Sequence, residues 1–314
     1  LGIKVPILVL SYTDPVRVEE IIKYNITQTV FSHDLPRALS KAAVKMGREA
    51  RIHIKIDTGM TRVGFKPGYG AVKDVVEINS LPGIIIEGLF SHFSSADEED
   101  PGFTMIQYER FESIVNELNR IGIIIPVKHI ANSAAVIRYP NLDLDMVRPG
   151  IILYGLYPSV ELNNTAIDLK PAMELKANVI LVKDVEANVP VSYGRTYVTK
   201  DGAAVATLPI GYADGYSRLL SNRGRVMING EYAPIIGSIC MDQCMVDVTG
   251  IKHTVKTGDE AVLIGSQGGN NITADEIANL TNTINYEVVC LIGKRIPRVY
   301  IKGGEVVKVV NYLI

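Results

Sequence analysis

The stretch Ile52-His-Ile-Lys-Ile-Asp-Thr-Gly-Met-Thr-Arg62 decides the fold, because an apolar strand runs directly into a polar, glycine-containing loop. The same transition recurs along the first half of the chain, where short apolar runs alternate with helical patterns. Repeated βα units with nearly continuous apolar strands indicate a parallel sheet covered by helices. The predicted strands span residues 6–10, 29–31, 52–56, 84–90, 127–131 and 146–154.

The helix signals between these strands are of the usual kinds. Asp14 and Pro15 predict the start of a helix, and Gly47 predicts the end of the helix that contains Met46. A further helix is expected at 72–78. The clearest helix is expected over 104–122, with Thr104 and Gln107 as a capping box.

Six strands fit an open, doubly wound sheet, whereas a closed (β/α)₈ barrel needs eight. The chain opens on Leu1-Gly-Ile-Lys-Val-Pro, a pattern typical of a helix end entering a strand. We therefore expect an α/β protein with a TIM-type (β/α)₈ barrel whose first two βα units precede Leu1. The barrel is predicted over 1–166, and a mostly β domain is predicted over 167–314. Within that domain, Asn229-Gly230 predicts a type I′ hairpin over 226–233.

Composition excludes several classes of protein. The 314 residues are 47% hydrophobic and 21% charged with a net charge of −2, which predicts neither nucleic acid nor an anionic membrane as partner. No run approaches the ~18 apolar residues of a membrane-spanning helix. Cys240 and Cys244 lack the further ligands of a zinc site, so no metal is expected. An odd number of cysteines and no visible signal peptide favour the cytoplasm.

Polar groups follow four successive predicted strands, at the edge where parallel barrels collect their reactive groups. Taken alone, His92 is either a structural histidine or a neighbour that stacks on a flat ring. Asn132-Ser133 caps the next helix, binds a phosphate, or does both. Arg148 either pairs with Asp143 or Asp145 or contacts a ligand, and Arg62 is either a solvated loop charge or a ligand contact.

Several common cofactor and catalytic motifs are absent. The chain contains no G-x-G-x-x-G after a strand, no Walker loop and no H-E-x-x-H. It also lacks the G-x-S-x-G of a nucleophile elbow.

Polar and glycine-containing motifs follow one another in order along both halves of the chain. In the first half they are Lys55-Ile-Asp-Thr-Gly-Met-Thr-Arg-Val-Gly64, His129-Ile-Ala-Asn-Ser-Ala134 and Val147-Arg-Pro-Gly-Ile151. In the second half they are Val191-Ser-Tyr-Gly-Arg-Thr-Tyr197, Pro209-Ile-Gly-Tyr-Ala-Asp-Gly-Tyr216, Gly237-Ser-Ile-Cys-Met-Asp-Gln243, Thr283-Ile-Asn-Tyr-Glu287 and Arg295-Ile-Pro-Arg-Val-Tyr300. Together these ordered motifs resemble those of the alanine racemases.

The resemblance implies a fold-type III enzyme, in which pyridoxal 5′-phosphate at a barrel mouth stabilises a carbanion. Two bases on opposite faces of the substrate exchange the α-proton, and Tyr193 matches one of them. The other is the Schiff-base lysine of a V-K-A-x-A-Y-G-H-G type motif. This motif is missing from these residues and is expected upstream of Leu1. A free phenol has a pKa near ~10, so Tyr193 needs assistance from its neighbours.

The resemblance also assigns the remaining site residues. His92 matches the residue that stacks on the cofactor ring, and Arg148 matches the partner of the pyridine nitrogen. Lys55 matches a position that is carbamylated in some members of the family, where the resulting anion pairs with Arg62. Phosphate-binding positions match Ser133, Gly150, Ile151 and Tyr300, and substrate-binding positions match Arg62 and the Met241 backbone.

The family implies a homodimer with shared active sites, in which Tyr193 and Met241 act in trans. We expect a small amino-acid substrate, and a cytoplasmic isomerase that supplies D-alanine for the cell wall. Two alternatives stay open. One is an inactive fragment that only dimerises or weakly binds pyridoxal phosphate, and the other is a racemase of serine or another small amino acid.

Overall fold

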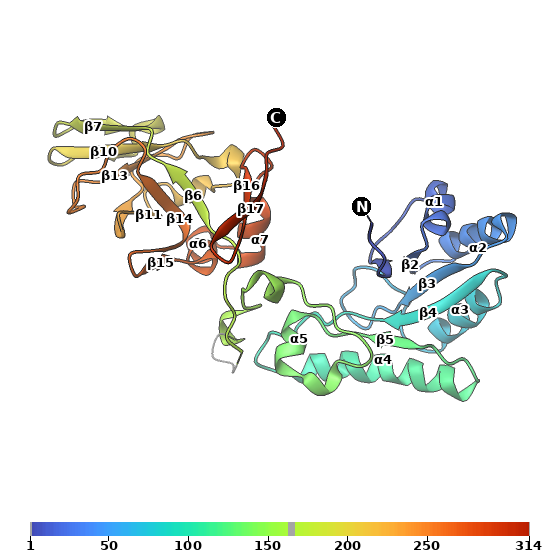
Figure 1. The fold of residues 1–314 in the computed structure, drawn as a ribbon. Helices are drawn as coiled ribbons and strands as arrows, with labels where there is room; N and C mark the ends of the chain where they lie inside the picture. Colours follow the sequence, from blue (N-terminus) through green and yellow to red (C-terminus); the bar gives the residue numbers. More distant parts are fainter. Residues whose placement is uncertain (1, 163–166, 314) are drawn as a thin grey trace. The chain divides into compact units, whose positions relative to one another are not determined.

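A computed structural model of the chain describes residues 2–162 and 167–313 (Figure 1). It consists of two compact units, Leu1–Leu169 and Lys170–Ile314. The domain boundary predicted at 166–167 adjoins residues 163–166, which lie outside the described residues.

The first unit contains a parallel sheet of five strands in the order β1-β2-β3-β4-β5. The sixth predicted strand is wrong, because 146–154 forms a loop followed by the 3-10 helix η3. Pro149 has no N–H to donate to a sheet ladder, which disfavours a strand at this point. The strands are β1 Ile7–Val9, β2 Ile26–Val30, β3 Ala50–Lys55, β4 Ile84–Phe90 and β5 Val127–His129, and η3 is Ile151–Tyr154.

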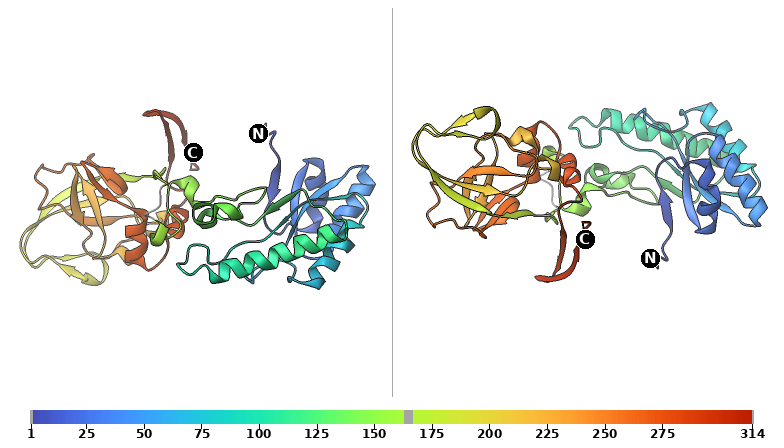
Figure 2. Two further views of the ribbon diagram at one scale, coloured as in Figure 1. Left: turned by 90° about the horizontal axis from the view of Figure 1, so that it is seen from below. Right: turned by 90° about the horizontal axis from the view of Figure 1, so that it is seen from above.

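Strand order argues against the open, doubly wound sheet. Each strand pairs with the next one in the chain, whereas a doubly wound sheet reverses direction at a switch point. One hydrophobic core joins the apolar face of β3 to all four crossover helices, so these helices cover a single face of a curled sheet (Figures 1 and 2). The crossover helices are α1 Val18–Lys23, α2 Asp34–Met46, α3 Tyr69–Asn79 and α4 Gly102–Arg120, and α5 Ser133–Arg138 follows β5.

Two helix ends agree with the sequence-based predictions, and a third differs from its prediction. Asp14 accepts a hydrogen bond from the Val16 backbone N–H at 2.9 Å, at the 3-10 turn η1 (Pro15–Arg17) that leads into α1. Gly47 ends α2 in the left-handed conformation. The predicted capping box is wrong: α4 begins at Gly102, and both Thr104 and Gln107 are buried within it.

The second unit is mostly β and contains two short helices. Asn229 and Gly230 both have positive φ between antiparallel β11 and β12, which confirms the type I′ hairpin. One sheet has the order β13-β10-β7, another β12-β11-β14-β15 with β6 on β14, and β8–β9 and β16–β17 form separate pairs. The elements are β6 Leu175–Asn178, β7 Leu181–Val185, β8 Pro190–Val191, β9 Tyr197–Val198, β10 Ala203–Leu208, β11 Arg225–Ile228, β12 Glu231–Pro234, β13 Cys244–Asp247, β14 Glu260–Gln267, β15 Asn270–Ile272, α6 Ala274–Thr281, α7 Asn285–Leu291, β16 Arg298–Lys302 and β17 Glu305–Val310.

A search of the described helices finds none with the length and apolar character needed to span a bilayer.

The packing of α2 against the sheet generates a stability prediction. Leu39 is fully buried in the core of the first unit, whereas Val44 on the same helix is 58% exposed. We expect Leu39→Ala to lower the free energy of unfolding by about 2–5 kcal/mol, because it removes transfer energy and leaves a cavity. Val44→Ala is the control and should change it by less than about 0.5 kcal/mol. Urea titrations measure both, and equal losses would contradict the assignment of this face of α2 to the core.

Candidate functional site

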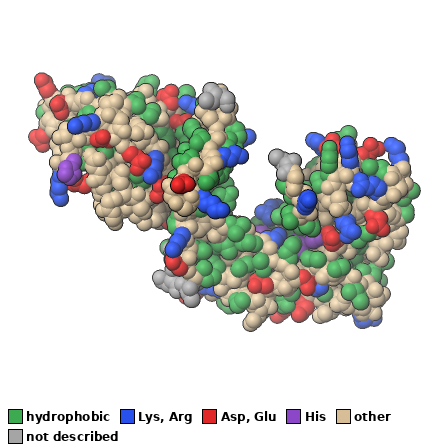
Figure 3. Space-filling model, viewed as in Figure 1, with side chains coloured by type: hydrophobic (Ala, Val, Ile, Leu, Met, Phe, Trp, Pro, Cys, Tyr) green, Lys and Arg blue, Asp and Glu red, His purple; other side chains and the backbone are tan. Residues whose placement is uncertain are grey.

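The face of the sheet that carries no helices is polar near the ends of its strands. On β3, Ile52 and Ile54 point into the helix-covered core, so His53 and Lys55 point to the opposite face. His129 at the end of β5 meets His53 there, with 2.9 Å between His53 Nδ1 and His129 Nε2. Histidine and basic side chains gather in a hollow of this unit in Figure 3.

Arg148 lies at the centre of this polar face. Its Nη2 donates to the carbonyl oxygens of Ser91 at 2.7 Å and Ile130 at 3.2 Å, and it lies 3.2 Å from His92 Nδ1. Its Nη1 contacts His129 Nδ1. The guanidinium has only donors, so both imidazole nitrogens act as acceptors and both rings are neutral at these atoms.

The predicted ion pair between Arg148 and Asp143 or Asp145 is wrong. Asp145 instead pairs with Lys128, with 2.7 Å between Oδ2 and Nζ, and also accepts the Lys128 backbone N–H. Backbone hydrogen bonds determine which partner each side chain can reach. Asp145 N donates to the Lys128 carbonyl oxygen and Arg148 N to that of Ala131, so the two side chains reach different surroundings.

Burial and the Arg148 charge favour the neutral form of the surrounding bases. Burial is the largest cause in each case, and it lowers the pKa of His92 to about 3 and of His129 to about 2. The pKa of His53 falls to about 4 for the same first reason. Burial, followed by the charge of Arg148, lowers the pKa of Lys55 to about 7, and burial lowers that of Arg148 itself to about 10.

Two segments predicted to bind a phosphate meet beside this cluster. Asn132 caps α5 by accepting the Ala135 backbone N–H at 3.1 Å, which confirms its predicted capping role. Ser133 Oγ accepts the Gly150 backbone N–H at 2.7 Å. This contact joins the start of α5 to the Gly150-Ile151 segment, so three of the four predicted phosphate residues lie together.

The loop that carries Arg62 is held by groups that the sequence reasoning did not select. Asp57 Oδ1 accepts the backbone N–H groups of Gly59 at 3.1 Å and Thr61 at 2.9 Å, and Thr61 has a φ of 56°. From α4, Arg110 donates to the Thr58 carbonyl oxygen at 2.8 Å. Arg62 itself is exposed at the end of this constrained loop.

Gln107 of α4 supports the adjacent loop after β4. Its Nε2 donates to the His92 carbonyl oxygen at 3.1 Å and to Thr58 Oγ1 at 3.3 Å, and its Oε1 accepts the Ser94 backbone N–H at 2.9 Å. A buried amide with both donor and acceptor satisfied explains why Gln107 is inside the helix rather than at its cap. A helical spacing pattern cannot distinguish these two roles.

In the second unit, Tyr193 and Met241 belong to segments that are hydrogen-bonded to each other. Ser238 Oγ donates to the Tyr193 carbonyl oxygen at 3.0 Å, and Ser192 Oγ donates to the Ser238 carbonyl oxygen at 2.5 Å. Tyr193 is 72% exposed and Met241 is 56% exposed. Tyr300, which is half-exposed, belongs to a different element, β16.

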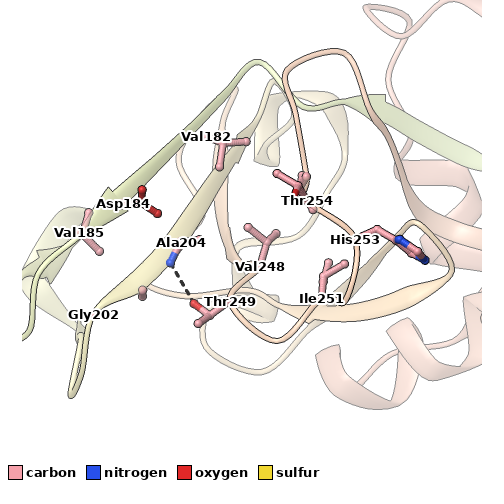
Figure 4. Close-up of a pocket in the computed structure, with 12 residues that line it drawn as sticks. Val182, Asp184, Val185, Gly202, Ala204, Val248, Thr249, Ile251, His253 and Thr254 are labelled. Carbon is pink, nitrogen blue, oxygen red and sulfur yellow. Dashed lines mark hydrogen bonds between the residues drawn. The ribbon is translucent and has the colours of Figure 1, made fainter.

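A cavity in the second unit is a weaker candidate for a ligand-binding site (Figure 4). Its volume is about 560 Å³, and its lining is mostly apolar. The hydroxyl of Thr249 is already used, because it accepts the Ala204 backbone N–H at 2.9 Å and donates to Asp247. Asp184 and His253 lie on opposite sides of it, so its polar groups do not converge.

Comparison with known proteins identifies similar chains. The model described as "Alanine racemase, N-terminal domain" matches residues 1–158, and "Alanine racemase, C-terminal domain" matches 172–300. An alanine racemase of Clostridium novyi is 51% identical over 312 residues, which are 99% of this chain and 81% of the relative.

Solved structures agree with these matches. An alanine racemase of Clostridium difficile 630 has a TM-score of 0.95 at 42% identity and covers 100% of this chain and 81% of its own. Its complex with cycloserine has a TM-score of 0.91 at 40% identity, with 100% and 80% covered.

The buried neutral histidines generate a pH prediction. Histidine has a pKa near ~6.5 in an unfolded chain, so the unfolded state binds more protons than the folded state between about pH 6.5 and 4. The free energy of unfolding is therefore not reduced by these histidines above pH 6.5. Below that pH it falls as the pH decreases, by at most about 1.4 kcal/mol per pH unit for each histidine.

His92→Gln should reduce the dependence of the unfolding free energy on pH by up to about 1.4 kcal/mol per pH unit, the largest contribution of one histidine. The exposed His253→Gln is the matched control and should leave the slope unchanged. Urea titrations at pH 6.5, 5.8 and 5.0 measure the slopes, and identical slopes in both variants would contradict the assigned neutrality of His92.

Proposed function

Because the chain belongs to the alanine racemase family, we propose that it interconverts L- and D-alanine with pyridoxal phosphate as cofactor. One structural observation supports this most directly. The partly buried Arg148 cation, the neutral His92 and the joined Ser133–Gly150 segments lie together at the ends of parallel strands. We further propose that the curled sheet is part of a (β/α)₈ barrel.

The residues present fit this cofactor. When bound, pyridoxal phosphate supplies an electron sink for a carbanion. Arg148 remains charged at neutral pH despite its lowered pKa, and it offers only donors, so it pairs with an unprotonated ring nitrogen. His92 provides a flat neutral ring. Ser133, Gly150, Ile151 and Tyr300 supply the hydroxyl and backbone groups proposed to hold the phosphate.

Proton exchange at the substrate is assigned to two bases. Tyr193 Oη holds the proton on the side that serves the L-enantiomer, and the second base is the lysine of the motif not contained in these residues. We propose a homodimer in which Tyr193 and Met241 serve the cofactor site of the partner. Arg62 and the Met241 backbone bind the substrate, and the reaction supplies D-alanine in the cytoplasm.

Lys55 is proposed to carry a carbamate. Its uncharged amine is abundant near neutral pH, because the pKa is about 7. The Nζ lone pair of the uncharged amine attacks the carbon of CO₂. As the N–C bond forms, one C–O π bond breaks, its electron pair stays on oxygen, and one N–H proton leaves to solvent. The neutral amine thus becomes an anion beside Arg62 and Arg148, which lie close enough for their charges to act on Lys55.

The racemase assignment is tested with the native polypeptide, pyridoxal phosphate and L-alanine. We expect loss of ellipticity and appearance of D-alanine. Tyr193→Phe should lower the rate by about 10²–10⁴-fold, the usual contribution of a general base. The exposed Tyr24→Phe, at the end of α1, is the control and should leave the rate unchanged. L-alanine that keeps its optical activity with the unaltered polypeptide would exclude this function.

The carbamate is tested with ¹³C-bicarbonate at pH 8. We expect one slowly exchanging carbamate carbon resonance that disappears in Lys55→Met. Lys45→Met is the control, because Lys45 is exposed and paired with Glu19 at 2.9 Å. A spectrum that is the same for the unaltered chain and Lys55→Met would contradict the modification.

A further inference from the structure

Behind Arg148 lies a row of two buried histidines and a partly buried glutamate to which the proposed function gives no role. His129, which contacts Arg148, is fully buried, and its other ring nitrogen lies 2.9 Å from His53 Nδ1. His53 is also buried, and its Nε2 lies 3.8 Å from Glu87 Oε2. We call these three residues, His129, His53 and Glu87, the His–His–Glu row.

Hydrogen-bond chemistry fixes the direction of every proton in this row. Arg148 can only donate, so His129 Nδ1 is an acceptor and its proton sits on Nε2. That proton points at His53 Nδ1, which is therefore also an acceptor. The His53 proton then sits on Nε2 and faces the Glu87 carboxylate. All donors in the row point from the cation toward the anion.

The backbone is shaped to accommodate this row. The pairing of β3 with β4 shifts register between Ile52 and His53, so Glu87 is the extra residue of a bulge. Gly88 follows it, and a Cβ there would lie 2.3 Å from His53 Nδ1. Only glycine leaves room for the His53 ring at this position.

Glu87 is itself held in place at the far end. Its Oε2 accepts from Thr27 Oγ1 at 2.9 Å, and its Oε1 accepts from Arg51 at 3.2 Å. The carboxylate therefore has a fixed position 3.8 Å from His53 Nε2, where its negative charge favours a proton on that nitrogen. A proton on Nε2 leaves His53 Nδ1 as the acceptor for His129.

We propose that His53 and Glu87 are positioning residues that act through His129 to fix the Arg148 guanidinium. This inference rests on the proposed function only in taking the pyridine nitrogen of the cofactor as the group that Arg148 serves. Without the row, the His129 Nε2–H would be buried with no acceptor. The ring would then reorient, and Arg148 would lose the acceptor that holds its Nη1.

A purely structural role is the competing interpretation. The His129 ring stacks on Phe90, with 4.6 Å between centroids and 8° between planes, so both imidazoles also fill space. A packing role predicts that removing His53 weakens every ligand equally. A positioning role predicts a loss confined to ligands that have a ring nitrogen for Arg148 to contact.

The first experiment uses ¹⁵N NMR of the histidine and arginine side chains, which is simple because the chain has five histidines. We expect His53 and His129 to be neutral Nε2–H tautomers at pH 7. His53→Leu should give His129 a mixture of tautomers and shift the Arg148 side-chain resonances. His53→Gln, which keeps an acceptor, should restore the single tautomer, and His253→Gln should change nothing.

The second experiment measures binding of pyridoxal phosphate and of its analogue with carbon in place of the ring nitrogen. We expect His53→Leu to weaken pyridoxal phosphate by about tenfold and the analogue by less than about twofold, since one hydrogen bond to a charged group is affected. Gly88→Ala should act in the same way by displacing His53. Gly70→Ala is its control, because a Cβ there meets nothing within 4 Å.

The outcomes distinguish failure of the positioning role from failure of the proposed cofactor. A His129 ring found as the Nδ1–H tautomer, or equal losses for both ligands, would overturn the positioning role. If the unaltered chain binds neither ligand, the proposed cofactor fails. The tautomer of His129 and the Arg148 resonances in His53→Leu still decide whether the row fixes the guanidinium.

Discussion

A partly buried guanidinium that has no carboxylate partner among the described residues is the constraint on which the first unit depends. Arg148 is held by two carbonyl oxygens and two imidazole nitrogens, all of them neutral acceptors. A protonated imidazole has no lone pair to offer, so His92 and His129 must remain neutral for Arg148 to stay in place. Within residues 2–162 and 167–313 the positive charge therefore has no paired carboxylate, and the surrounding site favours ligands that bring acceptors or negative charge.

The alternation along β3 makes this arrangement compatible with a stable fold. Its isoleucines pack against the crossover helices, while His53 and Lys55 occupy the opposite face. Because side chains alternate with a period of two, a slip of one residue would bury two bases in the apolar core and expose that core. The register that stabilises the sheet is thus the register that assembles the site, and the two cannot vary separately.

Sequence reasoning predicted the strand ends and their polar residues, because both depend on local patterns. Asn132 and Ser133 illustrate this, since a capping sequence directly after a strand is readable from its order. The ion-pair partner of a charged residue could not be predicted from the sequence. Asp145 is close to Arg148 in sequence but pairs with Lys128, which lies further away along the chain. The pattern over 146–154 was apolar enough for a strand, yet Pro149 interrupts it. Tyr193 is one of 15 tyrosines and was distinguished only by the family resemblance.

The residues proposed for the site differ in character between the two units. In the first unit, Lys55 is buried and His92 is partly buried, and desolvation and the charge of Arg148 lower the pKa of both. Tyr193 is largely exposed, and it follows Ser192 and precedes Gly194, which both have positive φ. Strained backbone around an exposed side chain is retained only where the surroundings hold it, and it is frequent at functional sites. Tyr193 is therefore presented on the surface of its own unit, and the proposed partner subunit would cover it.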